Sequence, residues 1–260
     1  MYQWSVDSKR RSDYGDTPDG DTPNDGAPEY KARKVRAMFG AIAERYDFLN
    51  HFLSANLDRG WRMACVREVS RQIKAASPKI LDIGCGTADL SVAFSDTGTV
   101  IGCDFCHEML IRGIRKAKRH NSRFSISLLE ADALALPFPD KTFDVAVSAF
   151  VLRNLADMRR GLDEMRRVLR PGGVLGILDF GMPRLPLVRR IYGFYFLKVL
   201  PRLGQWISGA TEPYRYLPAS VQDFPSAEEL KKKAGNAGFR DIHIRRLSAG
   251  VAVLLTGIRE

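Results

Sequence analysis

Five short apolar segments between residues 79 and 180 constrain the fold of this 260-residue chain more than any other feature. Each is rich in aliphatic residues, as in "KILDIG", "TVIGCD" and "VLGILD". The segments between them, such as "HEMLIRGIRKAKRH", carry apolar residues at helical spacing. Strands that alternate with helices form a parallel sheet with right-handed crossovers and helices on both faces. The sequence therefore predicts an α/β, Rossmann-like doubly wound fold.

The other segments extend this core. The N-terminal segment is rich in Asp, Gly, Pro and Thr, which predicts disorder. We expect the helix in "DMRRGLDEMRRVLRPGG" to be closed by its Pro-Gly-Gly, and the C-terminal segment to complete a mostly parallel sheet of about seven strands, the last antiparallel. The predicted organisation is a disordered acidic segment at 1–29 and a single domain at 30–260, divided into an N-terminal helical cover (30–76), a cofactor-binding core (77–181), a helical insert (182–225) and the completion of the sheet (226–260).

Charge is distributed unevenly along the chain. The net charge is +10, but residues 1–29 hold seven acidic and three basic residues, so residues 30–260 carry +14. A body this basic attracts nucleic acid, anionic membranes or anionic small molecules. We expect no nucleic-acid partner, because the basic residues alternate with bulky aliphatic ones and no Asn-Pro-Pro-Tyr-type motif for a base amine is present.

The cysteines and the apolar runs indicate a cellular location. Cys65, Cys85, Cys103 and Cys106 predict reduced thiols in a cytoplasmic protein. A zinc site usually needs two ligand pairs, and the chain has one C-x-x-C, so we expect no metal. No run of about 18 apolar residues would span a bilayer, and the N-terminus lacks the apolar region of a secretory signal.

A glycine-rich turn follows the first predicted strand in "ILDIGCGTADL". Gly84 and Gly86 let the backbone turn tightly and approach a ligand without a Cβ clash. The pattern G-x-G-x-x-D lacks the third glycine of dinucleotide-binding proteins. Asp82 would repel a phosphate but attract an ammonium group such as that of S-adenosylmethionine. The alternative is that the glycines serve only the turn from strand to helix.

Acidic residues end the next two predicted strands. Asp104 follows Gly84 by twenty residues, a spacing at which an acid accepts hydrogen bonds from the hydroxyls of an adenosine ribose. Asp132 ends the third strand, where it would accept from the adenine amino group while the small Ala133 leaves room for the ring. The alternative for each acid is an ordinary loop or helix-cap residue. Together they predict a site for S-adenosylmethionine beyond the carboxyl ends of the strands.

The sequence resembles the class I S-adenosylmethionine-dependent methyltransferases, and more narrowly the quinone C-methyltransferases of menaquinone and ubiquinone biosynthesis. The narrower resemblance spans roughly residues 35–260 and is carried by "VRAMFGAIAERYDFLNHFLSANLDRGWR", "LDIGCGTADL", "ADALALPFPDKTFD", "FVLRNLADMRRGLDEMRRVLRPGG" and "YRYLPASVQDFPSAEEL". It implies methyl transfer to a ring carbon of a polyprenylated hydroquinone, in first place demethylmenaquinol to menaquinol. The alternative is a ubiquinone precursor or another small phenolic or lipid substrate.

The resemblance adds positions to those already identified. The predicted cofactor-site residues are Asp82, Gly84, Gly86, Thr87, Asp104, Phe105, Asp132, Ala133 and Ala149. The chain departs from the family pattern, in which an acid usually follows the Met-Phe near the start and Ser-Phe-Gly commonly precedes Leu-Arg-Asn. Gly40 stands in place of the acid. Ala149 stands in place of the serine and Val151 in place of the glycine. These departures bear on the identity of the substrate more than on the type of reaction.

The Arg-Asn pair of the family falls on Arg153 and Asn154, which the resemblance implies are catalytic. A hydroquinone carbon becomes nucleophilic as a hydroxyl group loses its proton. Arg153 is not a conventional base at its normal pKa, but it would stabilise the developing phenolate or orient a water, and Asn154 would fix the oxygen. Tyr46, Asp47 and Asn50, on the N-terminal cover, are the predicted substrate-binding residues.

The insert is the densest aromatic and basic stretch of the chain. Between residues 184 and 207, bulky apolar side chains alternate with Arg and Lys, a pattern typical of helices that lie on anionic membrane surfaces. We therefore expect contact with the inner face of the cytoplasmic membrane, where the polyprenyl substrate resides. The alternative is a helix packed on the core or on a second copy in a homodimer.

Overall fold

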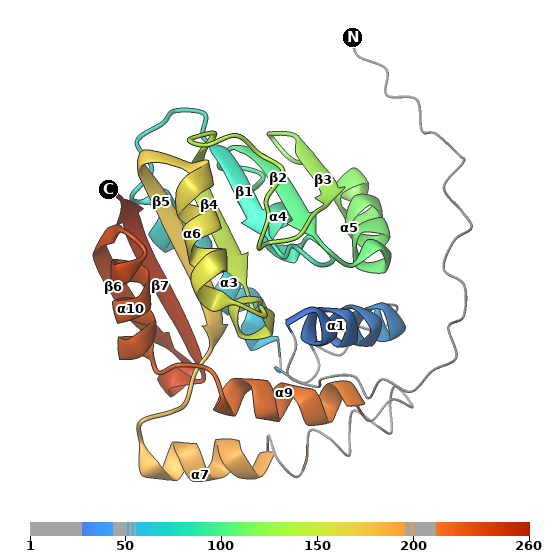
Figure 1. Cartoon of the computed structure of the whole chain (residues 1–260), viewed down its shortest axis with the longest axis vertical. Coiled ribbons are helices and arrows are strands. Elements are labelled where there is room, and N and C mark those ends of the chain that lie inside the picture. Colours follow the sequence, from blue (N-terminus) through green and yellow to red (C-terminus); the bar gives the residue numbers. More distant parts are fainter. Residues whose placement is uncertain (1–27, 44–50, 52–53, 55, 196–198, 200–211) are drawn as a thin grey trace.

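A computed structural model describes residues 28–43, 51, 54, 56–195, 199 and 212–260. Within this part of the chain one sheet has the strand order β3-β2-β1-β4-β5-β7-β6 (Figure 1). Its strands are β1 (Lys79–Ile83), β2 (Thr99–Asp104), β3 (Ile126–Glu130), β4 (Phe143–Ala149), β5 (Leu169–Phe180), β6 (Phe239–Leu247) and β7 (Ala252–Arg259). The first five strands pair in parallel with one another, and β7 is antiparallel to both β5 and β6. This sheet confirms the predicted doubly wound, mostly parallel fold.

Helices cover both faces of the sheet. The helices are α1 (Pro28–Ile42), α3 (Leu57–Ser70), α4 (Asp89–Phe94), α5 (His107–Arg119), α6 (Met158–Val168), α7 (Pro186–Phe194), α9 (Glu212–Gln222) and α10 (Ala227–Asn236), with short 3-10 turns η1 (Leu152–Asn154) and η3 (Ser248–Gly250). On one face, Cys65 and Val69 of α3 pack with Phe94 of α4 against the central strands. On the other face, Leu162 of α6 and Leu230 of α10 enclose a second apolar core. The parallel strands are buried from both sides, as their continuous apolar sequences require.

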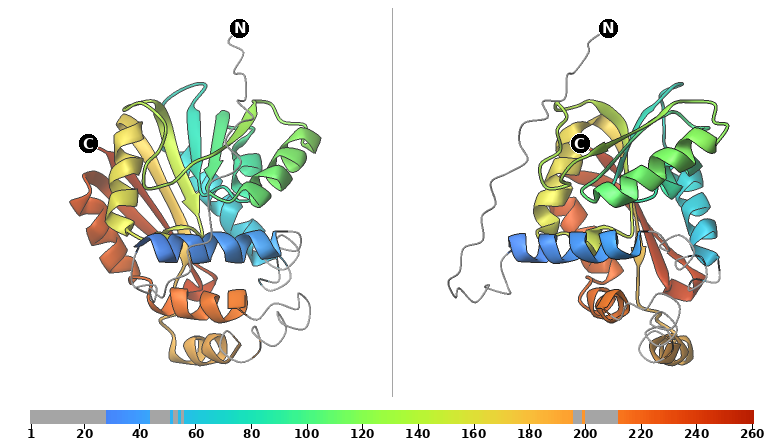
Figure 2. Two further views of the ribbon diagram at one scale, coloured as in Figure 1. Left: turned by 45° about the vertical axis from the view of Figure 1, so that its right-hand side comes forward. Right: turned by 90° about the vertical axis from the view of Figure 1, so that its right-hand side faces the viewer.

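Three of the described helices lie beyond the carboxyl ends of the parallel strands. Figures 1 and 2 show α1, α7 and α9 together at this end of the molecule, below the tips of the strand arrows. α1 contacts α5 and α9, and α9 also contacts η1. α1, from the predicted N-terminal cover, and α7 and α9, from the predicted insert, thus lie over the edge of the sheet where ligands bind in folds of this class, whereas α3 of the cover packs on a face of the sheet. Among the described helices, none combines the length and the apolar character that crossing a membrane requires.

Two boundaries differ from the sequence-based expectation. The Pro-Gly-Gly at 171–173 does not close α6, which ends at Val168, because β5 begins at Leu169 and runs through these residues. Leu169 pairs with Phe143, and the register between β4 and β5 shifts directly after this pair, so that several residues of β5 face one residue of β4. Gly172, with φ of +76°, lies in this irregular stretch. In addition, α1 starts at Pro28, so the last two residues of the predicted disordered segment are helical, and residues 1–27 lie outside the described residues.

Candidate active site

A cavity of about 720 Å³ lies at the carboxyl ends of the parallel strands, where residues of α1 also line it. It is lined by Arg33, Arg36, Phe39, Gly84, Gly86, Asp104, Phe105, Met109, Glu130, Ala131, Asp132, Ala133, Leu134, Ala149, Phe150, Val151, Asn154, Leu155, Ala156 and Arg160. Seven of the nine predicted cofactor-site residues are among them. The other two, Asp82 and Thr87, are buried and do not line the cavity. The fold therefore gathers residues from four strand ends around one space.

The glycine turn forms the floor of this cavity. Gly84 and Gly86 have φ of +69° and +53°, in the left-handed region that glycine adopts without strain. A Cβ at Gly86 would meet no atom within 4 Å, so its backbone is open to a ligand. A Cβ at Gly84 would lie 2.4 Å from Val151 Cγ2. The valine that departs from the family pattern thus packs directly on the glycine turn.

Asp104 joins the glycine turn to the end of β2. Its Oδ2 accepts a hydrogen bond from Gly86 N at 2.8 Å, and its Oδ1 accepts one from Cys106 N, also at 2.8 Å. Burial raises the pKa of the Asp104 carboxyl, and these backbone donors oppose that shift. A carboxylate oxygen accepts more than one hydrogen bond, so both oxygens keep lone pairs for the hydroxyl groups of a ligand in the cavity.

Asp82 lies beneath the same turn, fully inside the protein. Its Oδ2 accepts from Ser91 Oγ at 2.6 Å, while its Oδ1 has no hydrogen-bond partner among the described residues. Burial raises the pKa of Asp82 to about 7, with Ser91 and Arg62 acting in the opposite direction and Asp104 reinforcing the rise. The predicted contact of Asp82 with a ligand ammonium group remains a prediction. Thr87, also buried, accepts from Lys116 Nζ at 3.1 Å.

The raised pKa of Asp82 makes stability depend on pH. The folded protein keeps the Asp82 proton up to about pH 7, whereas the unfolded chain loses it near pH 4. The contribution of this carboxyl to the free energy of unfolding is therefore greatest below pH 4 and falls as the pH rises towards 7. Asp82→Asn removes the titration. From about pH 5 to pH 8, the free energy of unfolding of the original chain, measured with urea and without ligand, is expected to fall relative to that of the variant by on the order of 2 kcal/mol. Parallel pH profiles would contradict this.

The end of β3 meets the middle of α1 at another side of the cavity. Arg36 of α1 forms an ion pair with Glu130, and His107 Nδ1 lies 3.2 Å from the other oxygen of the same carboxylate. Asp132 accepts a hydrogen bond from Leu134 N at 2.8 Å through Oδ1 and is exposed towards the cavity. Neither Glu130 nor Arg36 is among the residues predicted from the sequence. A signal was present, since Glu130 also ends a strand and pairs in register with Asp104.

The segment after β4 forms the side of the cavity nearest α9. Phe150 has φ of +64°, an unusual value for an aromatic residue, and such conformations concentrate at functional sites. Asn154 lines the cavity, and its Nδ2 donates to Phe150 O at 3.2 Å. The hydroxyl of Tyr216, on α9, donates to Asn154 Oδ1 at 3.2 Å. The carboxamide is therefore held in one orientation from two sides.

Arg153 is adjacent to the cavity but does not line it. Its side chain is only 5% exposed, and its Nη1 donates to Asp179 Oδ1 at 2.7 Å. The guanidinium also lies over the rings of Phe150 and Phe180, at 5.9 and 5.1 Å from their centres. The structure thus brings the predicted catalytic pair to the same corner, with one member facing the cavity and the other buried behind it.

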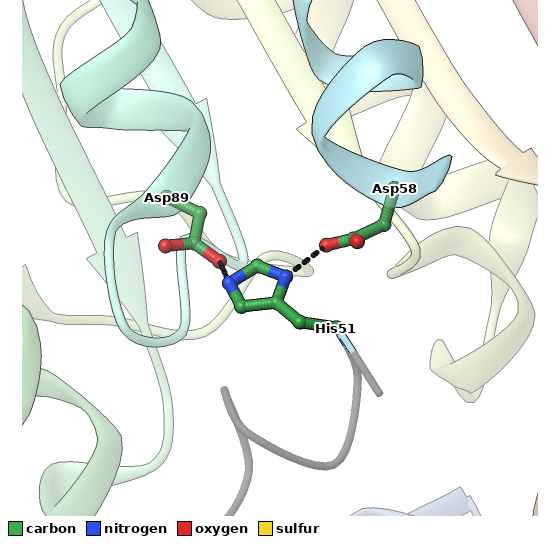
Figure 3. Close-up of side chains that lie close together, drawn as sticks. All are labelled: His51, Asp58 and Asp89. Atoms are coloured by element: carbon green, nitrogen blue, oxygen red, sulfur yellow. Dashed lines mark hydrogen bonds and ion pairs between the residues drawn. The ribbon is translucent and has the colours of Figure 1, made fainter. Parts of the chain in front are cut away.

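A second group of charged residues lies beside the glycine turn (Figure 3). His51 is 2.8 Å from Asp58 through Nδ1 and 4.0 Å from Asp89 through Nε2. These three side chains have the composition of a metal site. However, Arg62 pairs with both carboxylates and Lys116 with Asp89, so two cations already balance the two acids. We therefore describe the group as an ion-pair network that ties the cover and α3 to the start of α4.

The predicted substrate-binding residues Tyr46, Asp47 and Asn50 lie outside the described residues. The four cysteines are buried free thiols, and burial raises the pKa of each. That of Cys106 rises to about 11, so the thiol stays protonated at neutral pH and is a poor nucleophile.

Comparison with known proteins extends over nearly the whole described chain. Residues 28–259 match the ubiE/COQ5 methyltransferase family. The demethylmenaquinone methyltransferase of Thermus thermophilus is 43% identical, in a match that covers 85% of this chain and 100% of that protein. The ubiquinone/menaquinone biosynthesis C-methyltransferase UbiE of Geobacter sulfurreducens is 41% identical, covering 87% of this chain and 89% of that protein.

Solved structures share the fold at lower sequence identity. An S-adenosylmethionine-dependent methyltransferase from Thermotoga maritima superimposes with a TM-score of 0.56 at 19% identity, covering 86% of this chain and 100% of that one. The [4+2]-cyclase SpnF gives a TM-score of 0.63 at 17% identity, covering 87% of this chain and 95% of that one. At such identities the likeness establishes the class I methyltransferase architecture alone.

Proposed function

The chain belongs to the ubiE/COQ5 methyltransferase family and is thus an S-adenosylmethionine-dependent C-methyltransferase of ubiquinone and menaquinone biosynthesis, and from this premise we propose that it converts demethylmenaquinol to menaquinol. The proposed substrate rests on the names of two close relatives. The proteins of Thermus thermophilus and Deinococcus radiodurans, 43% and 40% identical, are both named demethylmenaquinone methyltransferase. Other relatives carry the name that covers both quinones.

The cavity suits the adenosine half of the methyl donor. We assign the ribose hydroxyls to Asp104, whose buried carboxylate faces the cavity, and the adenine to the space beside Asp132 and Ala133. The open backbone at Gly86 leaves room for the amino-acid portion. When bound, S-adenosylmethionine supplies a methyl group on a positively charged sulfur, which retains the electron pair of the carbon–sulfur bond.

We assign to Arg153 and Asn154 the stabilisation of the methyl acceptor as it loses its hydroxyl proton. The hydroxyl proton of the quinol passes to water, which leaves a phenolate whose adjacent ring carbon forms the new carbon–carbon bond and then loses its hydrogen as a proton, also to water. Asn154, at the cavity wall, would donate to the phenolate oxygen from a carboxamide held by Tyr216. The permanent charge of Arg153 would lower the energy of the developing anion, an effect that is strong in a site with little water.

We further propose that α7 contacts an anionic membrane surface. Leu187 and Phe194 on this helix are 71% and 66% exposed, and Arg189 and Arg190 between them are also exposed. Apolar side chains next to basic ones favour insertion at the boundary between lipid headgroups and acyl chains. The remainder of the predicted membrane segment, at 196–198 and 200–207, lies outside the described residues.

Charge reversal on α7 tests this membrane contact. The double variant Arg189→Glu, Arg190→Glu is expected to lower the partition coefficient onto vesicles containing phosphatidylglycerol, measured by co-sedimentation, by at least about 30-fold, because each of the two lost basic residues contributes about 1 kcal/mol near the surface. Lys231→Glu with Lys232→Glu, on exposed positions of α10, is the matched control. Equal binding of the original chain to neutral and anionic vesicles would count against the contact and in favour of packing on a second copy.

The substrate assignment is tested with labelled S-adenosylmethionine and a panel of demethylated quinols. We expect the greatest kcat/KM with demethylmenaquinol and a mass gain of one methylene unit in the product. A higher kcat/KM with the ubiquinone precursor would replace the proposed substrate. Labelling of simple phenols alone, without either prenylated quinol, would contradict both.

A further inference from the structure

β5 ends in a buried carboxyl group that the sequence did not single out. The strand is apolar from Val174 to Leu178, and Asp179, which follows, is only 1% exposed. Leu178 pairs in register with Ala149 at the end of β4. Asp179 therefore lies at the edge of the sheet where the cavity opens, one strand away from the predicted catalytic pair.

Asp179 is the carboxylate that holds Arg153. Its Oδ1 accepts from Arg153 Nη1 at 2.7 Å and from the backbone N–H of Phe180 at 2.8 Å. The rings of Phe150 and Phe180 flank the same guanidinium. A charge-assisted hydrogen bond and two aromatic faces together leave the arginine few other orientations.

Stability alone does not account for this pair. Asp179 Oδ2 is buried without a hydrogen-bond partner among the described residues, and burial raises the pKa of the carboxyl against the opposing charge of Arg153. Buried ion pairs often contribute little net stability, and an unsatisfied buried oxygen is unfavourable. A carboxylate kept at such a position is better explained by what it does to the arginine.

The surroundings of the pair connect it to the site of methyl transfer. Tyr192 of α7 and Tyr216 of α9 lie close enough that both charges affect their pKa values, which burial raises. Tyr216 also bonds to Asn154, which lines the cavity. The Arg153–Asp179 pair, on η1 and β5, thus lies near α7 and α9, beside the cavity wall.

We propose that Asp179 is a positioning residue for methyl transfer, which fixes the guanidinium of Arg153 beside Asn154 before the acceptor hydroxyl loses its proton. Because the positive charge is already oriented, it stabilises the developing phenolate without reorganisation at the moment of reaction. This inference rests on the proposed function, since it requires that Arg153 act on the acceptor. It assigns no contact between Asp179 and either substrate.

The test measures kcat, the dissociation constant of S-adenosylmethionine and Tm for Asp179→Asn and Asp179→Glu. Asn keeps the size of the side chain and an acceptor oxygen but removes the charge. We expect its kcat to fall about 10-fold, with cofactor affinity within about twofold of the original. Glu restores the charge and is expected to recover part of the lost kcat. Asp144→Asn, which alters an ion pair with Arg170 at the other end of the sheet, is the control.

Three outcomes would overturn the inference. In the first, Asp179→Asn retains full kcat while Arg153→Gln loses activity, which leaves the proposed function in place. In the second, kcat, cofactor affinity and Tm fall together for both Asp179 variants, as a purely structural role predicts. Should Asp179→Asn not fold, Asp179→Glu decides alone. Its side chain is one methylene longer and would shift the guanidinium of Arg153, so a folded Glu variant with the full kcat of the original chain also overturns the inference. Full activity of Arg153→Gln would instead contradict the role of Arg153 in the proposed function.

Discussion

Arg153→Gln is expected to lower kcat for quinol methylation about 100-fold while the dissociation constant of S-adenosylmethionine stays within about twofold. Gln keeps a polar group that fits between Phe150 and Phe180 but removes the charge that would stabilise the phenolate. Since Arg153 does not line the cofactor cavity, its loss should act on the chemical step and not on cofactor binding. Single-turnover kinetics with labelled cofactor, together with calorimetric titration, separate the two quantities.

The matched control is Arg170→Gln. Arg170 also pairs with an aspartate from a strand of the same sheet, but the pair is exposed and lies near the start of β5. Its replacement should leave kcat unchanged. If Arg153→Gln lost cofactor affinity by the same factor as kcat, this arginine would support the cavity as a whole, and the catalytic assignment would be wrong.

Asp104→Asn is expected to raise the dissociation constant of S-adenosylmethionine about 100-fold, which corresponds to about 2.8 kcal/mol. The carboxylate accepts from Gly86 N and Cys106 N and would accept from the ribose hydroxyls as well. An amide has one acceptor oxygen in place of two, so the variant loses charge-assisted bonds worth about 1.5–3 kcal/mol each. Asp96→Asn, at an exposed loop acid that accepts from Arg123 N, is the control.

The same residue predicts how cofactor binding depends on pH. Burial raises the pKa of Asp104, so the ionised form that accepts from the ribose is lost at a higher pH than for an exposed aspartate. Affinity should be greatest above this pKa and weaken as the pH falls through it. In Asp104→Asn this acid-side loss should disappear. Persistence of the same pH dependence in the variant would assign it to another group.

The strand ends and the glycine turn were predictable from sequence because a parallel sheet places the carboxyl ends of its strands at one edge. Gly84, Gly86, Asp104 and Asp132 follow successive strands in the sequence, and all of them line the cavity. The end of α6 was not predictable from its Pro-Gly-Gly. Pairing of Leu169 with Phe143 overrides the local signal for a turn, because a strand partner satisfies the backbone that a turn would leave to solvent.

The sequence by itself determined the fold class, the edge of the sheet at which the cavity lies and, through family resemblance, the type of reaction, since these depend on local periodicity and on residues at strand ends. Only the tertiary structure decided which charges meet. Arg153 pairs with Asp179, 26 residues away in the chain, and Arg36 pairs with Glu130, 94 residues away. Such pairs depend on how the strands are ordered and which helices lie over their ends. The same packing buried Arg153 behind the cavity wall and set Val151 against Gly84.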